Sequence, residues 1–174
     1  RRKVVLATAI AETSLTIEGI RVVVDAGLMR LPRFDPNSGL TRLATVPVSR
    51  ASADQRRGRA GRLEPGVCYR LWSEHLHLQP HSVAEILQAD LAALLLELAS
   101  WGVRDAAQLR WLDMPPAAHI AQATELLQKL GALDTGGQIT AHGRAVLELG
   151  THPRLAHMML RGAELGYGAL ACEL

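Results

Sequence analysis

The hydrophobic pattern of the sequence changes its period near residue 83, and this change divides the chain into two parts. Before it, short and nearly continuous apolar runs such as Val4–Ile10 and Arg21–Asp25 are separated by turn residues. Runs of this kind are typical of strands buried in a parallel sheet. After it, apolar residues recur at helical spacing over Ala84–Trp101 and Ala118–Leu130. The sequence therefore predicts the end of an α/β domain followed by a helical region.

Three further elements are predicted in the first part. The turn sequence Pro36–Gly39 indicates a β-hairpin with strands over Arg30–Asp35 and Leu40–Val48. The segment Ser52–Arg62 is expected to be a helix that begins near a Ser or Asp cap, and Val67–Trp72 is expected to be another short strand.

The second part is predicted to continue with a small β-hairpin and two more helices. Gly136 and Gly137 indicate the hairpin, and Thr140 is placed to cap a helix over Ala141–Leu149. A last helix is expected over Pro153–Gly166. The order helix, helix, small β wing, helix is a winged-helix-like arrangement.

Composition indicates a soluble, globular protein, because 48% of the residues are hydrophobic. The longest apolar stretch, near Leu91–Leu98, is too short to span a bilayer, so we expect no membrane partner. The net charge of only +2 is weak evidence for a nucleic-acid partner. Between Arg50 and Arg62, however, there are five arginines in thirteen residues and a single acid, Asp54. This local excess is the strongest charge feature of the chain.

The cysteines and histidines do not form a pattern that predicts a disulfide framework or a metal site. Cys68 and Cys172 lie far apart and outside any CxxC sequence. His75, His77 and His81 have no cysteine or acidic partner at ligand spacing, so no metal site is predicted. We expect a reducing, cytoplasmic setting.

The segment Gln55–Arg62, which reads QRRGRAGR, is the main candidate for chemistry. Gln55, Arg59 and Arg62 are spaced by four and three residues, and on a helix those positions share one face. Two guanidiniums and an amide on one face suit a phosphate target, because a guanidinium binds oxygen pairs and stays charged when desolvated. In phosphoryl transfer such an arginine stabilises charge on the γ-phosphate. For such a run considered by itself, a solvated basic helix face is the favoured interpretation.

A second segment, Thr8–Ile20, reads TAIAETSLTIEGI. It is rich in hydroxyl groups and follows the first predicted strand, and α/β sheets bind ligands at the carboxyl ends of their strands. By composition alone, an ordinary turn with capping hydroxyls explains it better.

Together, the two segments closely resemble motifs V and VI of the DEAH/RHA helicases of superfamily 2, and among these most resemble the bacterial HrpB-type members. The resemblance continues through almost the whole chain, in the segments Pro65–Trp72, Glu85–Leu87, Leu112–Pro116, Leu130–Leu133 and His152–Leu155. Motifs V and VI at this separation are a highly specific pair.

The resemblance implies a fold class and a division into domains. Residues 1–82 are expected to form the C-terminal part of the second RecA-like helicase domain, residues 83–150 a winged-helix domain, and residues 151–174 the start of a ratchet-like helical domain. The expected fold is thus an α/β fragment, the C-terminal half of a RecA-like parallel sheet with a β-hairpin insertion. An all-helical winged-helix domain and the start of a helical bundle follow it.

The resemblance also implies roles for single residues at the nucleotide. Gln55, Arg59 and Arg62 match the catalytic positions of motif VI, with Gln55 and Arg59 near the γ-phosphate and Arg59 as the arginine finger. Arg62 also matches a position near the ribose, together with Thr16 and Glu18. Glu18 stands where the family more commonly has Asp, which moves the carboxylate one methylene further out.

Other positions match residues that contact RNA. Thr8 and Ala9 match the part of motif V that touches the RNA backbone. Ala9 replaces the usual Asn, which removes a side-chain hydrogen-bond donor. The hairpin from about Leu31 to Thr45 matches an element implicated in separating strands.

The implied cofactor is ATP with Mg²⁺, and the implied partners are single-stranded or duplex RNA and an upstream RecA-like domain. The sequence contains neither a GxxxxGK[ST] loop nor a DEAH box, which hold the phosphates and Mg²⁺ in such enzymes. We therefore expect the chain to be part of an ATP-dependent RNA helicase that couples ATP hydrolysis to translocation on RNA or to its unwinding. By itself the chain is expected to be inactive.

Two alternative interpretations remain open at this point. The chain is a non-catalytic winged-helix module that binds nucleic acid or protein, or it is a truncated folding unit that binds nothing. The first residue is not Met, which favours a piece of a longer protein. The sequence assigns no oligomeric state.

Overall fold

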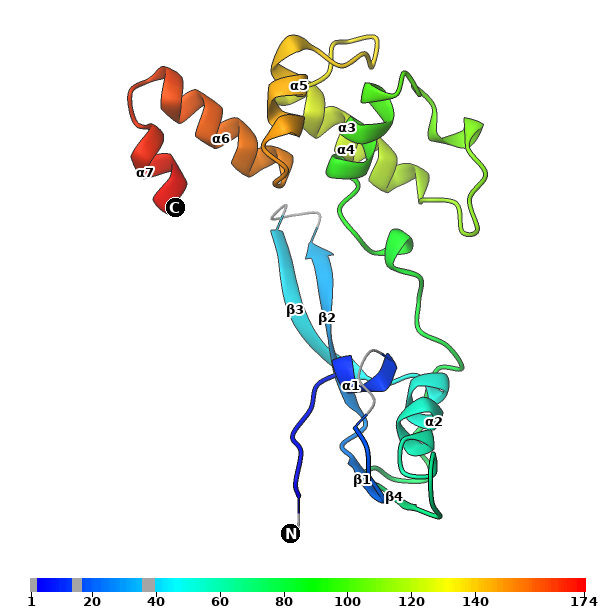
Figure 1. The fold of residues 1–174 in the computed structure, drawn as a ribbon. Coiled ribbons are helices and arrows are strands. Elements are labelled where there is room, and N and C mark those ends of the chain that lie inside the picture. Colours follow the sequence, from blue (N-terminus) through cyan, green and yellow to red (C-terminus); the bar gives the residue numbers. More distant parts are fainter. Residues whose placement is uncertain (1–2, 14–16, 36–39) are drawn as a thin grey trace. The chain divides into compact units, whose positions relative to one another are not determined.

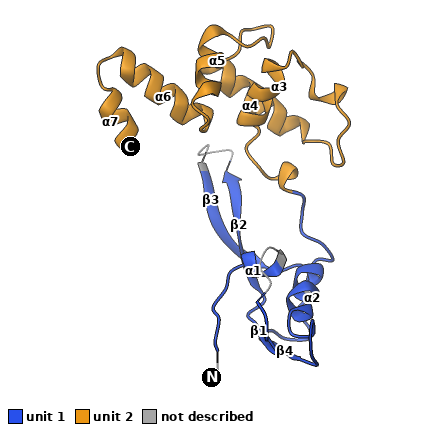
Figure 2. Ribbon diagram, in the orientation of Figure 1, with its two compact units in different colours: residues 1–84 blue, residues 85–174 orange. Residues whose placement is uncertain are grey.

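The computed structural model describes residues 3–13, 17–35 and 40–174. The chain forms two compact units, Arg1–Ala84 and Glu85–Leu174 (Figures 1 and 2). Within the described residues, no helix combines the length and the apolar character needed to cross a membrane.

The first unit contains a parallel pair of strands. Strand β1 (Val22–Asp25) lies beside β4 (Val67–Arg70), with Val22 opposite Val67 and Asp25 opposite Arg70. The backbone N–H of Leu71 continues the ladder by donating to the carbonyl of Asp25 at 2.9 Å. The expectation of a small parallel sheet is confirmed.

The predicted hairpin is present in the same unit. Strands β2 (Leu28–Asp35) and β3 (Leu40–Pro47) pair antiparallel along their whole length, from Leu28 opposite Pro47 to Asp35 opposite Leu40. The turn sequence expected between them, residues 36–39, lies outside the described residues.

The helix of this unit begins and ends earlier than the sequence predicts. Helix α2 (Arg50–Gly58) starts after Ser49, whose side chain accepts a hydrogen bond from the backbone N–H of Ser52 at 3.2 Å. The backbone N–H groups of its first two residues, Arg50 and Ala51, have no acceptor within the helix. They donate to the carbonyls of residues 79 and 80 at 2.8 and 3.1 Å. The helix ends at Gly58 and not at Arg62, since glycine is a poor helix former and a second one follows at residue 61.

The strand predicted over Val4–Ile10 is wrong. Residues 3–7 have no regular secondary structure, and a short helix, α1 (Ile10–Thr13), follows them. The apolar side chains of this run are exposed, 87% for Val4 and 96% for Leu6. An apolar run forms a strand only where a neighbouring strand pairs with its backbone groups, and β1 pairs with β4 instead.

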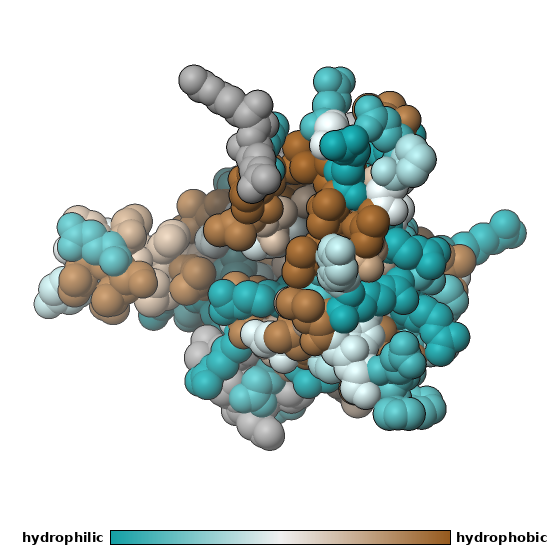
Figure 3. All heavy atoms as spheres, turned by 90° about the horizontal axis from the view of Figure 1, so that it is seen from below, coloured by the Kyte–Doolittle hydropathy of each residue, from teal (hydrophilic) through white to brown (hydrophobic). Residues whose placement is uncertain are grey.

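The first unit leaves much apolar surface open to solvent. Large apolar side chains of its parallel strands are more than half exposed, namely Val22, Val24, Val67 and Tyr69. Figure 3, which colours the residues of both units by hydropathy, shows hydrophobic residues at the surface of the face drawn. Its fully buried apolar residues are mostly small, such as Ala53 at 0% exposure.

The second unit contains four longer helices around one apolar core. They are α3 (Ala92–Ser100), α4 (Ala117–Lys129), α5 (Ala141–Glu148) and α6 (Pro153–Glu164). Each contributes at least one fully buried side chain to this core, including Leu96, Leu127, Val146 and Ala156.

The single helix predicted over Ala84–Trp101 is interrupted. A 3₁₀ turn, η1 (Glu85–Leu87), is followed by a gap, and α3 begins only at Ala92. In the gap, Asp90 accepts a hydrogen bond from the backbone N–H of Ala92 at 2.8 Å and pairs with His152 at 3.0 Å. A short acidic side chain that bonds to its own backbone competes with helix formation.

Between α3 and α4 the chain contains a second 3₁₀ turn, η2 (Ala106–Gln108). The predicted small hairpin between α4 and α5 is reduced to one antiparallel bridge, Leu133 to Ile139. Thr140 caps α5 as predicted, because its hydroxyl accepts from the backbone N–H of Gly143 at 2.9 Å.

A terminal helix, α7 (Gly168–Glu173), was not predicted and packs on α6. Gly162 of α6 makes this packing close, because a Cβ built there would lie 2.7 Å from the Cβ of Ala171. The positive φ of Gly166, 81°, turns the chain between the two helices.

Two histidines of the second unit face each other. Nε2 of His142 on α5 lies 2.9 Å from Nδ1 of His157 on α6. Burial, the charge of His142 and that of Arg161 lower the pKa of His157 below its ordinary value of 6.5, against a smaller opposing effect of the Leu130 carbonyl and Glu164. The folded protein thus favours a neutral His157.

We predict that acid destabilises the second unit partly through His157. A lowered folded-state pKa means that the unfolded chain binds more protons below pH 6.5, so stability is complete above that pH and is lost as the pH falls. The Tm of the wild type is expected to drop between about pH 7.5 and about pH 5.5, and to drop less in His157→Gln. His77→Gln, which changes an exposed histidine, is the control. Equal drops in wild type and His157→Gln would contradict the prediction.

Candidate functional site

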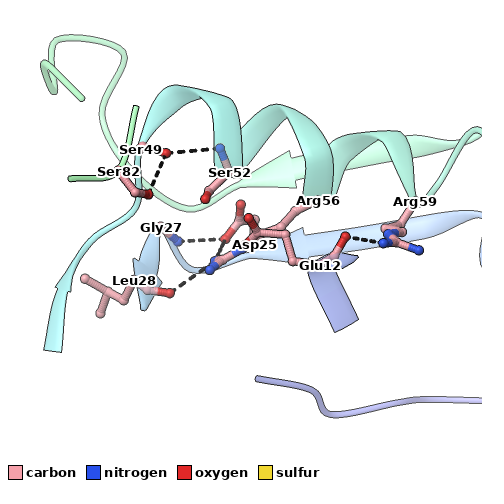
Figure 4. Close-up of polar contacts among 9 residues, drawn as sticks. All are labelled: Glu12, Asp25, Gly27, Leu28, Ser49, Ser52, Arg56, Arg59 and Ser82. Carbon is pink, nitrogen blue, oxygen red and sulfur yellow. Dashed lines mark hydrogen bonds and ion pairs between the residues drawn. The ribbon is translucent and has the colours of Figure 1, made fainter. Parts of the chain in front are cut away.

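The end of α2 and the short helix α1 come together in the first unit, and this contact joins the two segments singled out by the sequence (Figure 4). Arg59 follows the last residue of α2, and its Nη2 donates a hydrogen bond to the backbone carbonyl of Glu12 in α1. Arg59 is half-buried. The TAIAETSLTIEGI and QRRGRAGR segments are therefore neighbours in space, although Glu12 and Arg59 are 47 residues apart.

The expected common helix face for Gln55, Arg59 and Arg62 is only partly present. Gln55 lies on α2 and is exposed. Arg59 stands just beyond the helix, where its own N–H donates to the carbonyl of Arg56 at 3.1 Å in a turn. Arg62 is exposed and lies in the turn that follows. The premise of one continuous helix through Arg62 is wrong, because the helix ends at Gly58.

The turn that carries Arg59 is held by a close backbone contact. A Cβ built on Gly66 would lie 1.9 Å from the carbonyl oxygen of Ala60 and 2.7 Å from that of Arg21. Only glycine fits there, so the backbone just before β4 lies in close contact with the turn after α2. This contact fixes the turn relative to the sheet.

The other predicted site residues occupy the segment before β1. Thr8 is exposed and Ala9 half-buried, and their carbonyls accept hydrogen bonds from Ala11 and Glu12 at 3.2 and 2.9 Å at the start of α1. Glu18 is exposed in a turn. Thr16 lies outside the described residues.

No role was predicted for Arg56, which bonds to acceptors in three other elements of the first unit (Figure 4). Its Nε donates to Oε2 of Glu12 at 3.1 Å, and its Nη1 donates to Oδ1 of Asp25 at 2.9 Å. The same Nη1 lies 3.1 Å from the carbonyl oxygen of Leu28. Arg56 therefore connects α2 to α1, β1 and β2.

Asp25 is the buried end of this arrangement, with 3% of the residue exposed. Its Oδ1 also accepts from the backbone N–H of Gly27 at 3.0 Å, while Oδ2 has no hydrogen-bond partner among the residues that the structure describes. A signal for this pair was present in the sequence, because Asp25 ends a continuous apolar run. A buried acid needs a cation or several donors.

A second, exposed ion-pair group lies on another side of α2. Asp54 pairs with Arg70 at 2.6 Å and with Arg57 at 3.7 Å, and the hydrogen bond from Arg70 lowers the pKa of the Asp54 carboxyl against a smaller effect of burial. The guanidinium of Arg70 also lies 5.6 Å from the ring centroid of Trp72. Arg57 is 62% exposed.

Across the described part of the chain, no three His, Cys, Asp or Glu side chains are grouped as metal ligands. The donors near Arg59 are guanidinium and amide groups, which suit an anion and not a cation.

Comparison with known proteins identifies the family. Residues 1–64 match the family model described as helicase conserved C-terminal domain. The chain is 51% identical over 175 residues to ATP-dependent RNA helicase HrpB of Escherichia coli, a match that covers 99% of the chain and 22% of HrpB. A crystal structure of Escherichia coli DEAH/RHA helicase HrpB superposes with a TM-score of 0.83 at 53% identity, covering 88% of the chain and 20% of that structure. The chain thus matches a stretch of a DEAH/RHA-type, HrpB-like helicase.

Two further matches agree with this result. A second crystal structure, of Escherichia coli DExH-box NTPase HrpB, has a TM-score of 0.80 at 52% identity and covers 87% of the chain and 19% of that structure. The pre-mRNA-splicing factor ATP-dependent RNA helicase prp22 of Schizosaccharomyces pombe is 42% identical over 95% of the chain and 14% of its own length. The chain spans about a fifth or less of these relatives. The resemblance to HrpB-type DEAH/RHA helicases seen in the sequence is confirmed.

We predict that the buried ion pair of Asp25 is far more important for stability than the exposed one of Asp54. Asp25→Ala leaves a mostly buried Arg56 with one carboxylate fewer and is expected to lower the free energy of unfolding by about 3 kcal/mol. Asp54→Ala removes a partly exposed pair and is expected to cost less than about 1 kcal/mol. Urea unfolding of the two variants measures both values. A smaller loss for Asp25→Ala than for Asp54→Ala would contradict the assignment.

Proposed function

We propose that the chain is part of an ATP-dependent RNA helicase that couples ATP hydrolysis to translocation on RNA or to its unwinding. The observation that carries the proposal is the contact between Arg59 and the carbonyl of Glu12, which joins the segments that resemble motifs V and VI. The names of the relatives support it, since HrpB and prp22 are both described as ATP-dependent RNA helicases. This favours the helicase over a non-catalytic binding module.

The groups on this side of α2 fit the phosphate end of ATP. Arg59 supplies a permanent positive charge and directional donors, and Gln55 supplies an amide on the exposed surface one turn earlier. We assign Arg59 as the arginine finger, which stabilises charge that develops on the γ-phosphate oxygens, and place Gln55 beside the attacking water. Arg62, Thr16 and Glu18 are proposed to lie near the ribose.

The remaining parts of an ATP site are proposed to come from an upstream RecA-like domain outside this chain. Mg²⁺ neutralises phosphate charge in such sites and is held by carboxylates and hydroxyls. The sequence has no phosphate-binding loop of the GxxxxGK[ST] type, so the Mg²⁺ ligands are assigned to that domain. The chain alone is expected not to hydrolyse ATP.

RNA, single-stranded or duplex, is proposed to run past the start of α1. Thr8 is exposed there and Ala9 half-exposed, so backbone groups of this segment are available to RNA phosphates. We further propose that residues 1–82 are the C-terminal part of the second RecA-like domain and that the hairpin β2–β3 takes part in strand separation. Residues 83–150 would form a winged helix and residues 151–174 the start of a ratchet-like domain, in a cytoplasmic protein.

We predict that Arg59→Ala in a full-length protein carrying this chain lowers RNA-stimulated ATP hydrolysis by roughly 10³-fold, since arginine fingers contribute about that much to phosphoryl transfer. Nucleotide affinity is expected to be largely kept. Steady-state phosphate release and nucleotide titration measure the two quantities.

Arg57→Ala is the matched control, because it removes an arginine of the same run that pairs with the exposed Asp54. Its turnover is expected to equal that of the wild type. Wild-type turnover in Arg59→Ala would remove Arg59 from catalysis and, with it, the proposed function of this site.

A further inference from the structure

Arg56 differs from its neighbours in the arginine run by its burial. Its side chain is 17% exposed, compared with 62% for the adjacent Arg57. Both of its carboxylate partners are more buried still, at 11% for Glu12 and 2% for Asp25. A charged group is kept in such a place only when its partners are well positioned.

The geometry of these contacts requires a guanidinium. Nε and Nη1 of Arg56 point to different acceptors, the carboxylate of Glu12 in one direction and Asp25 with the Leu28 carbonyl in the other. A planar fork reaches both at once, whereas the ammonium of lysine is a point charge that reaches one carboxylate well. The contact fixes α2 to α1 and to β1 at the same point.

Glu12 accepts hydrogen bonds from two arginines, one within α2 and one just after the end of α2. Its carboxylate accepts from Arg56, and its backbone carbonyl accepts from Arg59. Figure 4 shows the two arginine side chains on the same side of α2, with Glu12 beneath them. A displacement of Glu12 relative to Arg56 therefore changes the position of the group that holds Arg59.

We propose that Arg56 is a positioning residue for catalysis, which sets the place of the Arg59 guanidinium by clamping α1 to the end of α2 through Glu12 and Asp25. This inference rests on the proposed function of Arg59. Arg56 itself does not act on the nucleotide, because the donors described above are directed at Glu12, Asp25 and Leu28.

A small displacement of the Arg59 guanidinium is expected to have a large effect on the catalytic rate. Catalysis by an arginine depends on where its guanidinium stands when charge develops, and a misplacement of about 1 Å costs up to about 10²-fold in rate. Weakening the clamp should therefore lower kcat more than it changes KM for ATP, since nucleotide binding is shared with groups outside this chain.

The experiment compares Arg56→Lys and Glu12→Gln in a full-length protein carrying this chain, each with Arg59 present and with Arg59→Ala. Glu12→Gln keeps the shape of the side chain and removes its charge, so it tests the clamp even where Arg56→Lys fails to fold. Arg57→Lys, an exposed neighbour of the same chemistry, is the control. RNA-stimulated ATP hydrolysis, KM for ATP and thermal unfolding are measured for every variant.

With Arg59 present, each clamp variant is expected to lower kcat by about tenfold or more and to change KM for ATP by less than about threefold. In the Arg59→Ala background the same changes are expected to cause no further loss, because a residue that acts through Arg59 has nothing left to position. Arg57→Lys is expected to keep wild-type kcat.

Two results would overturn the positioning role. One is a wild-type kcat in Glu12→Gln and in a folded Arg56→Lys. The other is a loss that adds fully to that of Arg59→Ala, which would show a purely structural or independent effect. If Arg59→Ala alone keeps wild-type turnover, the proposed function fails as well, so the two failures are distinguishable.

Discussion

A mostly buried guanidinium must be matched by carboxylates, and the architecture of the first unit depends on how Arg56 meets this requirement. Its ion pairs with Glu12 and Asp25 connect α2 to α1 and to the end of β1. The same unit has few large buried apolar side chains to hold its elements together. Directional polar contacts therefore supply positional precision that a larger apolar core would supply elsewhere, and they do so beside Arg59.

Much of the fold follows from local sequence signals. The hairpin, a small parallel sheet, the cap at Thr140 and most of the longer helices of the second unit were predicted, because turn residues and helical spacing act over a few residues. The errors have different causes. Val4–Ile10 has the composition of a strand but lies outside the pairing of β1 with β4, and such contacts distant in sequence leave no periodic signal. Asp90 instead interrupts a helical pattern through a local bond to the backbone N–H of Ala92.

The same distinction applies to the site. Gln55, Arg59 and Arg62 could be selected from the sequence because they belong to one short motif, whereas the importance of Arg56 depends on acids 44 and 31 residues away. Only the fold shows that Arg56 is directed inward and that Arg57 is exposed.

Helix α2 also has a mechanical consequence. At its N-terminus, backbone and side-chain groups of residues 49–51 bond to Gln79, Pro80 and Ser82, in the irregular stretch that leads out of the first unit. At its other end, about 13 Å away for nine helical residues, stands Arg59. A stiff helix shorter than three turns thus spans the whole distance between the exit of the chain and the arginine. A displacement of residues 79–82 would therefore also move the helix whose other end carries Arg59.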